Sequence, residues 1–318
     1  MLRFAITAPR LTSVAAWRDQ LRQIEDAGFD TVVVADHFTE GWDVEPMVAL
    51  TAAAMATSRL RLQTGVLGND YRHPVLVHRM AATLDVVSEG RFTLGLGAGW
   101  LRSDYEVAGI PLEPAGVRVT RLEEAVHVIK ALFGPDPVHH DGRHYRINGR
   151  INVPAPVQRP HPPMLLGGGS PRVLRLAGRE ADIVSIVASL RAGALGADSV
   201  ADLADDRVAE KLSWVREGIA AAGRAPGDVT LSINHWLVRV TDREADADTF
   251  LEKVAARQGV DPQLLRRSPA VLVGTVDHLV DVLEERQQRF GFSHLQVDAG
   301  FPASDIRPLF PLVDRLAR

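Results

Sequence analysis

The sequence contains no cysteine among its 318 residues. Without thiols the chain cannot form disulfides, zinc-thiolate sites or a thiol nucleophile. A chain of this length buries most of its unfolded surface, so it needs neither a crosslink nor a structural metal for stability. These absences fit a protein of a reducing compartment, and we expect a cytoplasmic protein.

The sequence also lacks concentrated positive charge and long apolar runs. Its formal net charge is −4, with lysine and arginine spread along the chain, so we expect neither nucleic acid nor an anionic membrane as partner. No stretch approaches the ~20 apolar residues of a membrane-spanning helix. The segment Met1–Thr7 is a short apolar strand without the apolar core and cleavage site of a signal peptide.

What the sequence does contain is a repeated alternation of apolar strands and amphipathic helices. Because strands recur at about thirty residues, the size of one βαβ unit, we expect a parallel sheet covered by helices. The expected fold class is α/β, a (β/α)8 TIM barrel, with an open doubly wound sheet as the alternative. No linker divides the chain, so residues 1–318 are expected to form one domain. The expected strands are 3–7, 31–35, 60–66, 91–97, 164–166, 182–187, 229–238 and 294–297.

Two stretches interrupt the alternation, at about 135–160 and 188–206. The first contains an expected β-hairpin over 138–153, with its turn at 140–142. We expect both to be loop insertions at the C-terminal face of the strands, where loops build the active sites of such barrels.

A run of glycines follows the fifth expected strand: Gly167, Gly168 and Gly169, then Ser170 and Pro171. Serine and proline suit the first positions of a helix, whose free N–H groups and dipole bind anions. Glycines let a phosphate approach the backbone closely. The pattern favours a phosphate site, and a tight turn without ligand is the alternative.

Asp36 and His37 directly follow the second strand, so their side chains should lie at the rim of the barrel. A histidine held by a neighbouring group can donate or accept a proton near neutral pH. The alternative is that Asp36 caps the next segment and His37 lies in the interior. Trp42, a few residues later, could form an aromatic wall of the substrate pocket.

The fourth strand ends in Gly97, Ala98, Gly99 and Trp100. This run departs from the dinucleotide-binding pattern G-x-G-x-x-G and lies far from the first strand. It is better explained as backbone clearance for a flat ring across the barrel mouth. The histidines of the hairpin, 139, 140 and 144, lack the carboxylate spacing of a metal site, so we assign none.

Several of these segments together resemble the luciferase-like monooxygenase superfamily of flavin and deazaflavin oxidoreductases. The matching segments run in the family's order along the chain: 25–31, 35–38, 91–100, 156–160, 167–171, 177–182 and 274–277. Within it, 68–74 and 108–111 resemble a group that uses the deazaflavin coenzyme F420.

The resemblance implies a luciferase-like barrel that holds the deazaflavin ring at the strand C-termini, in an enzyme whose relatives are usually dimers. By position, Asp36 and His37 would line the ring and the reaction centre. Gly65, Val66 and Leu67 would form a bulge behind it, where relatives have a non-prolyl cis peptide. The cofactor-binding set implied by the resemblance is Asp36, Gly65, Val66, Leu67, Asn69, Gly97, Ala98, Gly99, Gly167, Gly168, Gly169 and Ser170.

One position departs from the sugar-phosphate and secondary-alcohol dehydrogenase branches of this superfamily. Those branches carry an acidic residue after the Gly-x-Gly of strand four, where this chain has Trp100. The exchange suggests a more apolar substrate pocket without a second acid/base group at that place.

Our expectation is hydride transfer between F420 and a small organic substrate, with His37 as proton donor and Asp36 fixing its tautomer. The alternatives are an FMN-dependent monooxygenase and a non-catalytic flavin-binding protein.

Overall fold

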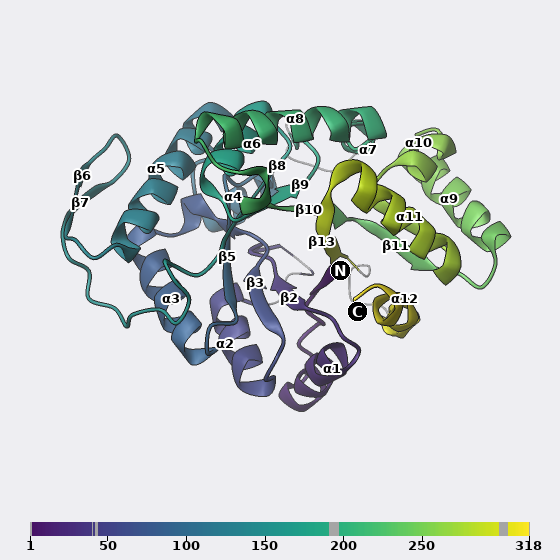
Figure 1. Ribbon diagram of the computed structural model, residues 1–318, viewed down its shortest axis with the longest axis horizontal. Helices are drawn as coiled ribbons and strands as arrows, with labels where there is room; N and C mark the ends of the chain where they lie inside the picture. Colours follow the sequence, from purple (N-terminus) through teal and green to yellow (C-terminus); the bar gives the residue numbers. More distant parts are fainter. Residues whose placement is uncertain (1, 40, 42–43, 191–196, 299–304, 318) are drawn as a thin grey trace.

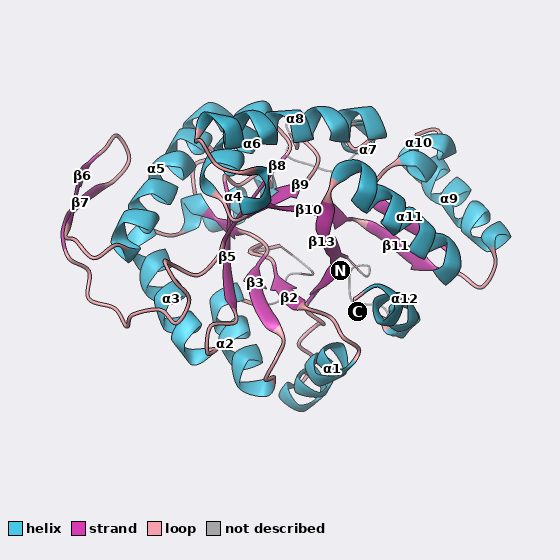
Figure 2. Cartoon of the chain, viewed as in Figure 1, coloured by secondary structure: helices cyan, strands magenta, loops and turns pink. Residues whose placement is uncertain are grey.

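The computed structural model describes residues 2–39, 41, 44–190, 197–298 and 305–317. Its central feature is a parallel β-sheet that closes on itself, surrounded by helices (Figures 1 and 2). The strands follow the order β3-β2-β1-β13-β10-β9-β8-β5-β4, and β3 also pairs with β5. Because β3 and β4 are two parts of one barrel position, the sheet is a closed eight-strand barrel. The expected TIM barrel is confirmed, and the open sheet is excluded.

Most residues of the barrel strands are buried because both faces of the sheet are covered. Their burial is nearly complete in β2, β5 and β9. The bounds of the strands are β1 Arg3–Thr7, β2 Thr31–Val34, β3 Arg61–Thr64, β4 Leu67–Gly68, β5 Phe92–Gly97, β8 Met164–Gly168, β9 Ile183–Ile186, β10 Thr230–His235 and β13 Phe292–Val297.

The helices bury one face against the barrel, as Trp17, Leu21 and Ile24 of α1 do. Their bounds are α1 Val14–Asp26, α2 Pro46–Ala56, α3 Pro74–Val87, α4 Arg102–Ala108, α5 Ala115–Phe133, α6 Pro171–Glu180, α7 Ala197–Ala201, α8 Asp205–Ala221, α9 Glu244–Gln258, α10 Pro262–Arg267, α11 Val276–Phe290 and α12 Phe310–Leu316, with 3-10 turns at Asn69–Tyr71, Pro226–Asp228 and Arg307–Leu309. No helix in the described ranges is long and apolar enough to cross a membrane.

The expected hairpin is present as β6 Val138–Asp141 and β7 Arg146–Gly149, paired antiparallel. Its turn begins at Gly142, two residues later than expected. The hairpin follows α5 rather than a barrel strand, so this insertion does not belong to a strand-to-helix loop of the C-terminal face. It projects outside the helical ring (Figure 1). The second insertion, 188–206, does follow a strand, β9, and contains α7.

The expected strand 229–238 is two strands in the structure. β10 ends at His235, and β11 Leu237–Val240 pairs with β12 Val271–Gly274 in a separate two-stranded sheet. Together with α9 and α10, this sheet encloses its own apolar cluster, which includes Leu251, Leu265 and Val273. Apolar alternation continues through Trp236, so the sequence pattern alone does not show where the chain leaves the barrel.

Candidate active site

A cavity of about 720 Å³ opens at the C-terminal ends of the barrel strands. Its size is typical of small-molecule and cofactor sites, and its place is that of TIM-barrel active sites. Of the residues singled out in the sequence, it is lined by Asp36, His37, Gly65, Val66, Gly97, Ala98, Gly99, Trp100, Gly167, Gly168, Gly169 and Ser170. Trp42 lies outside the described residues.

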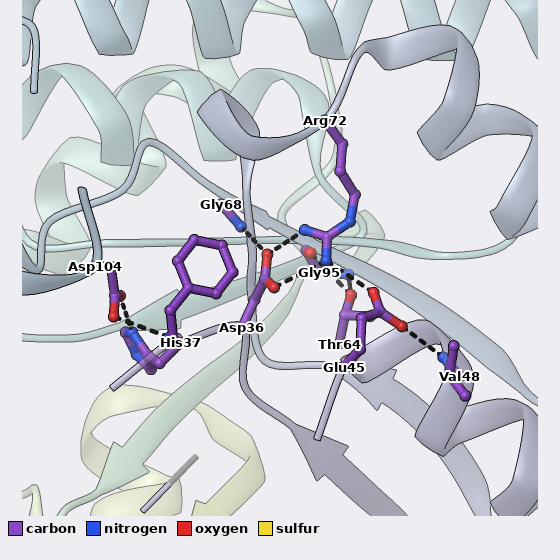
Figure 3. A network of polar contacts seen from close by, with 10 residues as sticks. Asp36, His37, Glu45, Val48, Thr64, Gly68, Arg72, Gly95 and Asp104 are labelled. Carbon is purple, nitrogen blue, oxygen red and sulfur yellow. Dashed lines mark hydrogen bonds and ion pairs between the residues drawn. The ribbon is translucent and has the colours of Figure 1, made fainter. Parts of the chain in front are cut away.

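Asp36 is buried at the wall of this cavity and is fixed by three donors. Arg72 Nη1 lies 2.5 Å from its Oδ2 and Nη2 lies 3.0 Å from its Oδ1, while the Gly68 backbone N–H donates to Oδ2 over 2.9 Å. Arg72 also donates to Glu45 over 2.8 Å. Figure 3 shows Asp36 between Gly68 and Arg72, and away from the ring of His37. A carboxylate held this firmly is a fixed charge of the site rather than a mobile base.

The partner of His37 is Asp104, not Asp36. His37 Nδ1 lies 2.6 Å from Asp104 Oδ2, and the Phe38 backbone N–H donates to Asp104 Oδ1 over 3.0 Å (Figure 3). A carboxylate on one ring nitrogen fixes the tautomer and orientation of an imidazole. The expectation that Asp36 has this role is therefore wrong, because Asp36 is already committed to Arg72.

Asp104 is the functional residue that the sequence reasoning missed. It lies in α4, in the connection that follows β5, and is fully buried although it carries a carboxylate. A buried carboxylate is rare unless it is paired. Trp100 does replace the acidic residue after the Gly-x-Gly, and its ring meets His37 edge to face at 5.7 Å. A second carboxyl, that of Asp104, lines the cavity four residues later, a position to which the expectation for Trp100 did not extend.

The expected bulge of strand three is present, and the Gly65–Val66 peptide bond is cis. The Thr64 hydroxyl bridges this bulge to β5, because it accepts from the Gly95 N–H over 2.7 Å and donates to the Gly95 carbonyl over 2.9 Å. A Cβ on Gly97 would lie 2.6 Å from Val66 Cγ2. The glycines of β5 are therefore required by the bulge beside them.

Two predicted cofactor-binding residues do not line the cavity. Leu67 packs into the main core, and Asn69 is buried with its amide donating to the Tyr145 hydroxyl over 3.2 Å. Asn69 thus connects the barrel to the β6–β7 hairpin. Both lie in the expected segment, but neither lines the cavity.

The β5 loop is held from behind by the residues of α4 and α5. Gly99 has φ +74°, and a Cβ there would lie 1.9 Å from the Tyr105 hydroxyl. Arg118 donates to the Gly99 carbonyl over 2.5 Å. Burial raises the pKa of Tyr105 to about 12, with the charge of Asp70 adding to it, so this hydroxyl stays protonated. The loop is held by these contacts, and its residues Gly97, Ala98 and Gly99 line the cavity.

A phosphate ligand is not needed to explain all three glycines of the run 167–169. A Cβ on Gly168 would lie 2.4 Å from Val173, and one on Gly169 would lie 2.4 Å from the backbone of Ala188 and Ser189. Both glycines are required by packing against other parts of the protein. Gly167 is different, since its nearest neighbour to such a Cβ is 3.7 Å away. The number of glycines is therefore not evidence for a phosphate, whereas their position on the cavity at the start of α6 fits one.

A buried lysine fixes this glycine loop to the 188–206 insertion. Lys211 of α8 is fully buried, and its Nζ donates to the Gly169 carbonyl and to Asp202 Oδ2, both over 2.6 Å. Asp202 in turn accepts from the Ser189 N–H over 2.7 Å. Burial alone would raise the pKa of Asp202, but the hydrogen bonds from Lys211 and Ser189 outweigh it and lower that pKa. The sequence reasoning did not identify this pair, because α8 is separated from the loop by one βα unit.

The hairpin histidines form no metal site. His140 lies 3.0 Å from Glu124 of α5 and His139 lies 2.7 Å from Asn148. Across the described residues, no group of three or more His, Asp or Glu side chains could hold a metal ion. His140 is therefore a structural partner of Glu124.

Comparison with known proteins adds the family to this geometry. The family model for luciferase-like monooxygenases matches residues 3–289. The chain belongs to this family. Luciferase-like monooxygenases share the barrel and flavin or deazaflavin chemistry, and relatives with each cofactor are found.

Three relatives illustrate that division. The chain is 29% identical to 4-hydroxyprotoasukamycin monooxygenase of Streptomyces nodosus subsp. asukaensis over 308 residues, which cover 90% of this chain and 81% of the relative. It is 29% identical to the F420-dependent glucose-6-phosphate dehydrogenase of Intrasporangium calvum, covering 88% and 87%. It is 26% identical to the FMNH2-dependent dimethylsulfone monooxygenase of Pseudomonas putida, covering 77% and 63%.

Solved structures agree on the fold. The monooxygenase RslO1 from Streptomyces bottropensis aligns with a TM-score of 0.77 at 22% identity, over 99% of this chain and 98% of that one. The coenzyme F420 dependent tetrahydromethanopterin reductase from Methanopyrus kandleri aligns with a TM-score of 0.76 at 20% identity, over 100% and 99%. The protein is thus a luciferase-like oxidoreductase that works with a flavin or a deazaflavin.

Proposed function

We propose that the protein is an F420-dependent oxidoreductase that transfers a hydride between the deazaflavin and a small organic substrate. The observation that carries this proposal is the His37–Asp104 pair at the wall of a mainly apolar cavity. Reduction of a carbonyl or oxidation of an alcohol moves one proton with each hydride, and a positioned histidine can supply or accept it. The relationship to an F420-dependent dehydrogenase over most of the chain supports the same choice.

The residues of the cavity fit such a cofactor. The cis Gly65–Val66 bulge and the Gly97–Gly99 backbone would flank its ring, and Gly167 and Ser170, with the N-terminus of α6, would hold its phosphate. Ser170 makes no side-chain capping bond within the helix, so its hydroxyl can serve a ligand. The bound cofactor would supply the hydride chemistry, while the protein orients it and excludes water.

Within this proposal each polar residue has a separate task. Asp104 bonds His37 at Nδ1 and would keep the imidazole ring oriented for proton exchange with the substrate. Asp36, fixed by Arg72, would shape the cavity wall beside the cofactor rather than exchange protons. Trp100 packs edge to face on His37 and limits the directions from which a substrate can reach it.

The second candidate is an FMN-dependent monooxygenase, which the two monooxygenase relatives favour. The two functions differ in their need for oxygen. We would test them by following oxidation of reduced F420 with a panel of enones, imines and ketones under strict exclusion of oxygen. Turnover without oxygen supports hydride transfer. Oxygen uptake that depends on reduced FMN, with no anaerobic turnover of F420, contradicts it.

We further propose that the protein acts in the cytoplasm as a homodimer. Val48 and Met55 on the outer face of α2 are 71% and 76% exposed, and large apolar side chains gathered on a surface favour association. Light scattering of the purified protein tests this proposal. A monomeric mass at micromolar concentration would contradict it.

A further inference from the structure

The cavity has a second polar wall, built by strands from the two ends of the chain. β1 and β13 pair so that Ile6 is opposite Val297, and β10 and β13 pair so that Asn234 is opposite Gln296. Since side chains alternate between the two faces of a strand, Thr7, Asn234, Gln296 and Asp298 all point to the barrel interior. All four line the cavity, and none of them was singled out in the sequence.

Two oxygen atoms of this wall lack hydrogen-bond partners among the described residues. They are Asn234 Oδ1 and Asp298 Oδ1, and both are buried. The Thr7 hydroxyl hydrogen-bonds the Asp298 carboxyl, and the Asp298 backbone N–H donates to the His235 carbonyl over 3.0 Å. A buried polar atom without a partner costs about 1–3 kcal/mol. In native proteins such atoms mark the place of a water or ligand.

The chemistry of this wall does not suit an anion. The described cavity residues of β1, β9, β10 and β13 and their C-terminal ends include no lysine or arginine. The cavity's arginines, Arg102 and Arg118, come from α4 and α5, and Arg118 is bonded to the β5 loop. Burial raises the pKa of Asp298, which makes its carboxyl a potential hydrogen-bond donor. When ionised, this carboxylate repels a phosphate or carboxylate, and no cation among the described residues of this wall offsets that repulsion.

We propose that Asp298, together with Thr7 and Asn234, is a substrate-positioning site that hydrogen-bonds an uncharged polar group, such as a hydroxyl, ketone or amide. The same residues discriminate against phosphorylated and carboxylated compounds. This inference rests on the proposed function in one respect, that the cavity receives the substrate. It does not depend on which of the two cofactors is bound.

The test measures binding of matched small probes to the cofactor-loaded protein by saturation-transfer NMR with competition. The probes are cyclohexanol, cyclohexanone and cyclohexanecarboxamide, with cyclohexanecarboxylate and glucose 6-phosphate as anionic counterparts. We expect the uncharged probes to bind at least about tenfold more tightly than the anionic ones. Tighter or equal binding of an anionic probe, or no binding of the uncharged ones, overturns the proposal.

Variants then locate the effect. Asp298→Leu removes the hydrogen bond and should weaken binding of the uncharged probes about tenfold, the size of one hydrogen bond. Asp298→Asn keeps a donor and an acceptor and should retain most of the affinity while improving binding of cyclohexanecarboxylate. If circular dichroism shows that Asp298→Leu does not fold, probe affinity is measured in Thr7→Val and Asn234→Leu instead. Unchanged probe affinity in the folded variants overturns the proposal.

The same samples are titrated with F420 and with FMN, which separates the two claims. Loss of probe binding with unchanged cofactor affinity supports substrate positioning. A wild-type preference for FMN would overturn the proposed function and leave the result on Asp298 standing. An equal loss of cofactor and probe affinity in Asp298→Leu would overturn the positioning role.

Discussion

The two walls of the cavity differ in how their polar groups are satisfied. On the wall of β2, β3 and β5, Asp36 is bonded to Arg72, His37 to Asp104, and the Thr64 hydroxyl to Gly95. On the wall of β1, β10 and β13, Asn234 and Asp298 each have an oxygen without a partner among the described residues. Groups bonded to one another are positioned before any ligand arrives. The comparison indicates that the wall of β2, β3 and β5 serves the chemical step and the wall of β1, β10 and β13 serves substrate recognition. We call them the chemical wall and the recognition wall.

The largest effect should come from the chemical wall. His37→Ala should lower kcat by about 10²–10⁴-fold, the usual contribution of a general acid, while F420 affinity changes little. Asp104→Asn should lower kcat, because the carboxylate that fixes the tautomer of His37 is lost, and it should leave KM nearly unchanged. Steady-state turnover of reduced F420 measures both, with Asp26→Asn, an exposed carboxylate, as control. Normal kcat in both variants would remove the pair from the mechanism.

The second effect concerns stability of that wall. Arg72→Met leaves the buried Asp36 without its ion partner, and breaking such a pair costs about 3 kcal/mol. Urea denaturation measures the loss in free energy of unfolding. The matched control is Arg59→Met, because Arg59 and Asp26 are 67% and 76% exposed and such a pair contributes at most about 1 kcal/mol. Equal losses of unfolding free energy in the two variants would show that Arg72 does not stabilise the Asp36 site.

The third prediction separates packing from ligand binding in the glycine loop. Gly169→Ala should destabilise the protein by about 1–3 kcal/mol because its Cβ meets the Ala188–Ser189 backbone. Gly167→Ala has room for its Cβ, so its stability should be normal and any loss should appear in cofactor affinity. Thermal melts and cofactor titrations of both variants provide the readout. Normal cofactor affinity in Gly167→Ala would argue against close approach of a ligand there.

The smallest expected effect is the pH dependence of stability that Asp298 of the recognition wall causes. Burial raises the pKa of Asp298 in the folded protein, so between about pH 4 and that higher value the folded state binds a proton that the unfolded chain releases. The contribution of Asp298 to the stability of the wild type therefore falls as the pH rises through this window. Asp298→Asn does not titrate, and its melting temperature relative to wild type should increase from pH 4 to pH 7. A constant difference across this range would contradict a raised pKa.

The sequence predicted the chemical wall better than the recognition wall. Asp36 and His37 could be identified because they follow a strand directly, and Gly65–Val66 because a family resemblance marks the bulge. Asp104 could not, since its role depends on the fold that places it beside His37. Thr7 and Asp298 are still harder to find, because closure of the barrel brings the first and last strands together.

The fold was predictable for a related reason. Strand and helix periods repeat locally, so β1, β2 and β5 lie close to their expected ranges. The break at Trp236 between β10 and β11 is decided by pairing with β12, which is distant in sequence. Local patterns therefore indicate elements, while partners across the fold determine where an element changes sheet.

The most direct test of the central claim is a parallel fluorescence titration of the purified protein with F420 and with FMN. Our account predicts saturable binding of F420 in the micromolar range or tighter, with FMN clearly weaker. Clear preference for FMN would contradict the hydride-transfer assignment and move the protein to the flavin-dependent monooxygenases of its family.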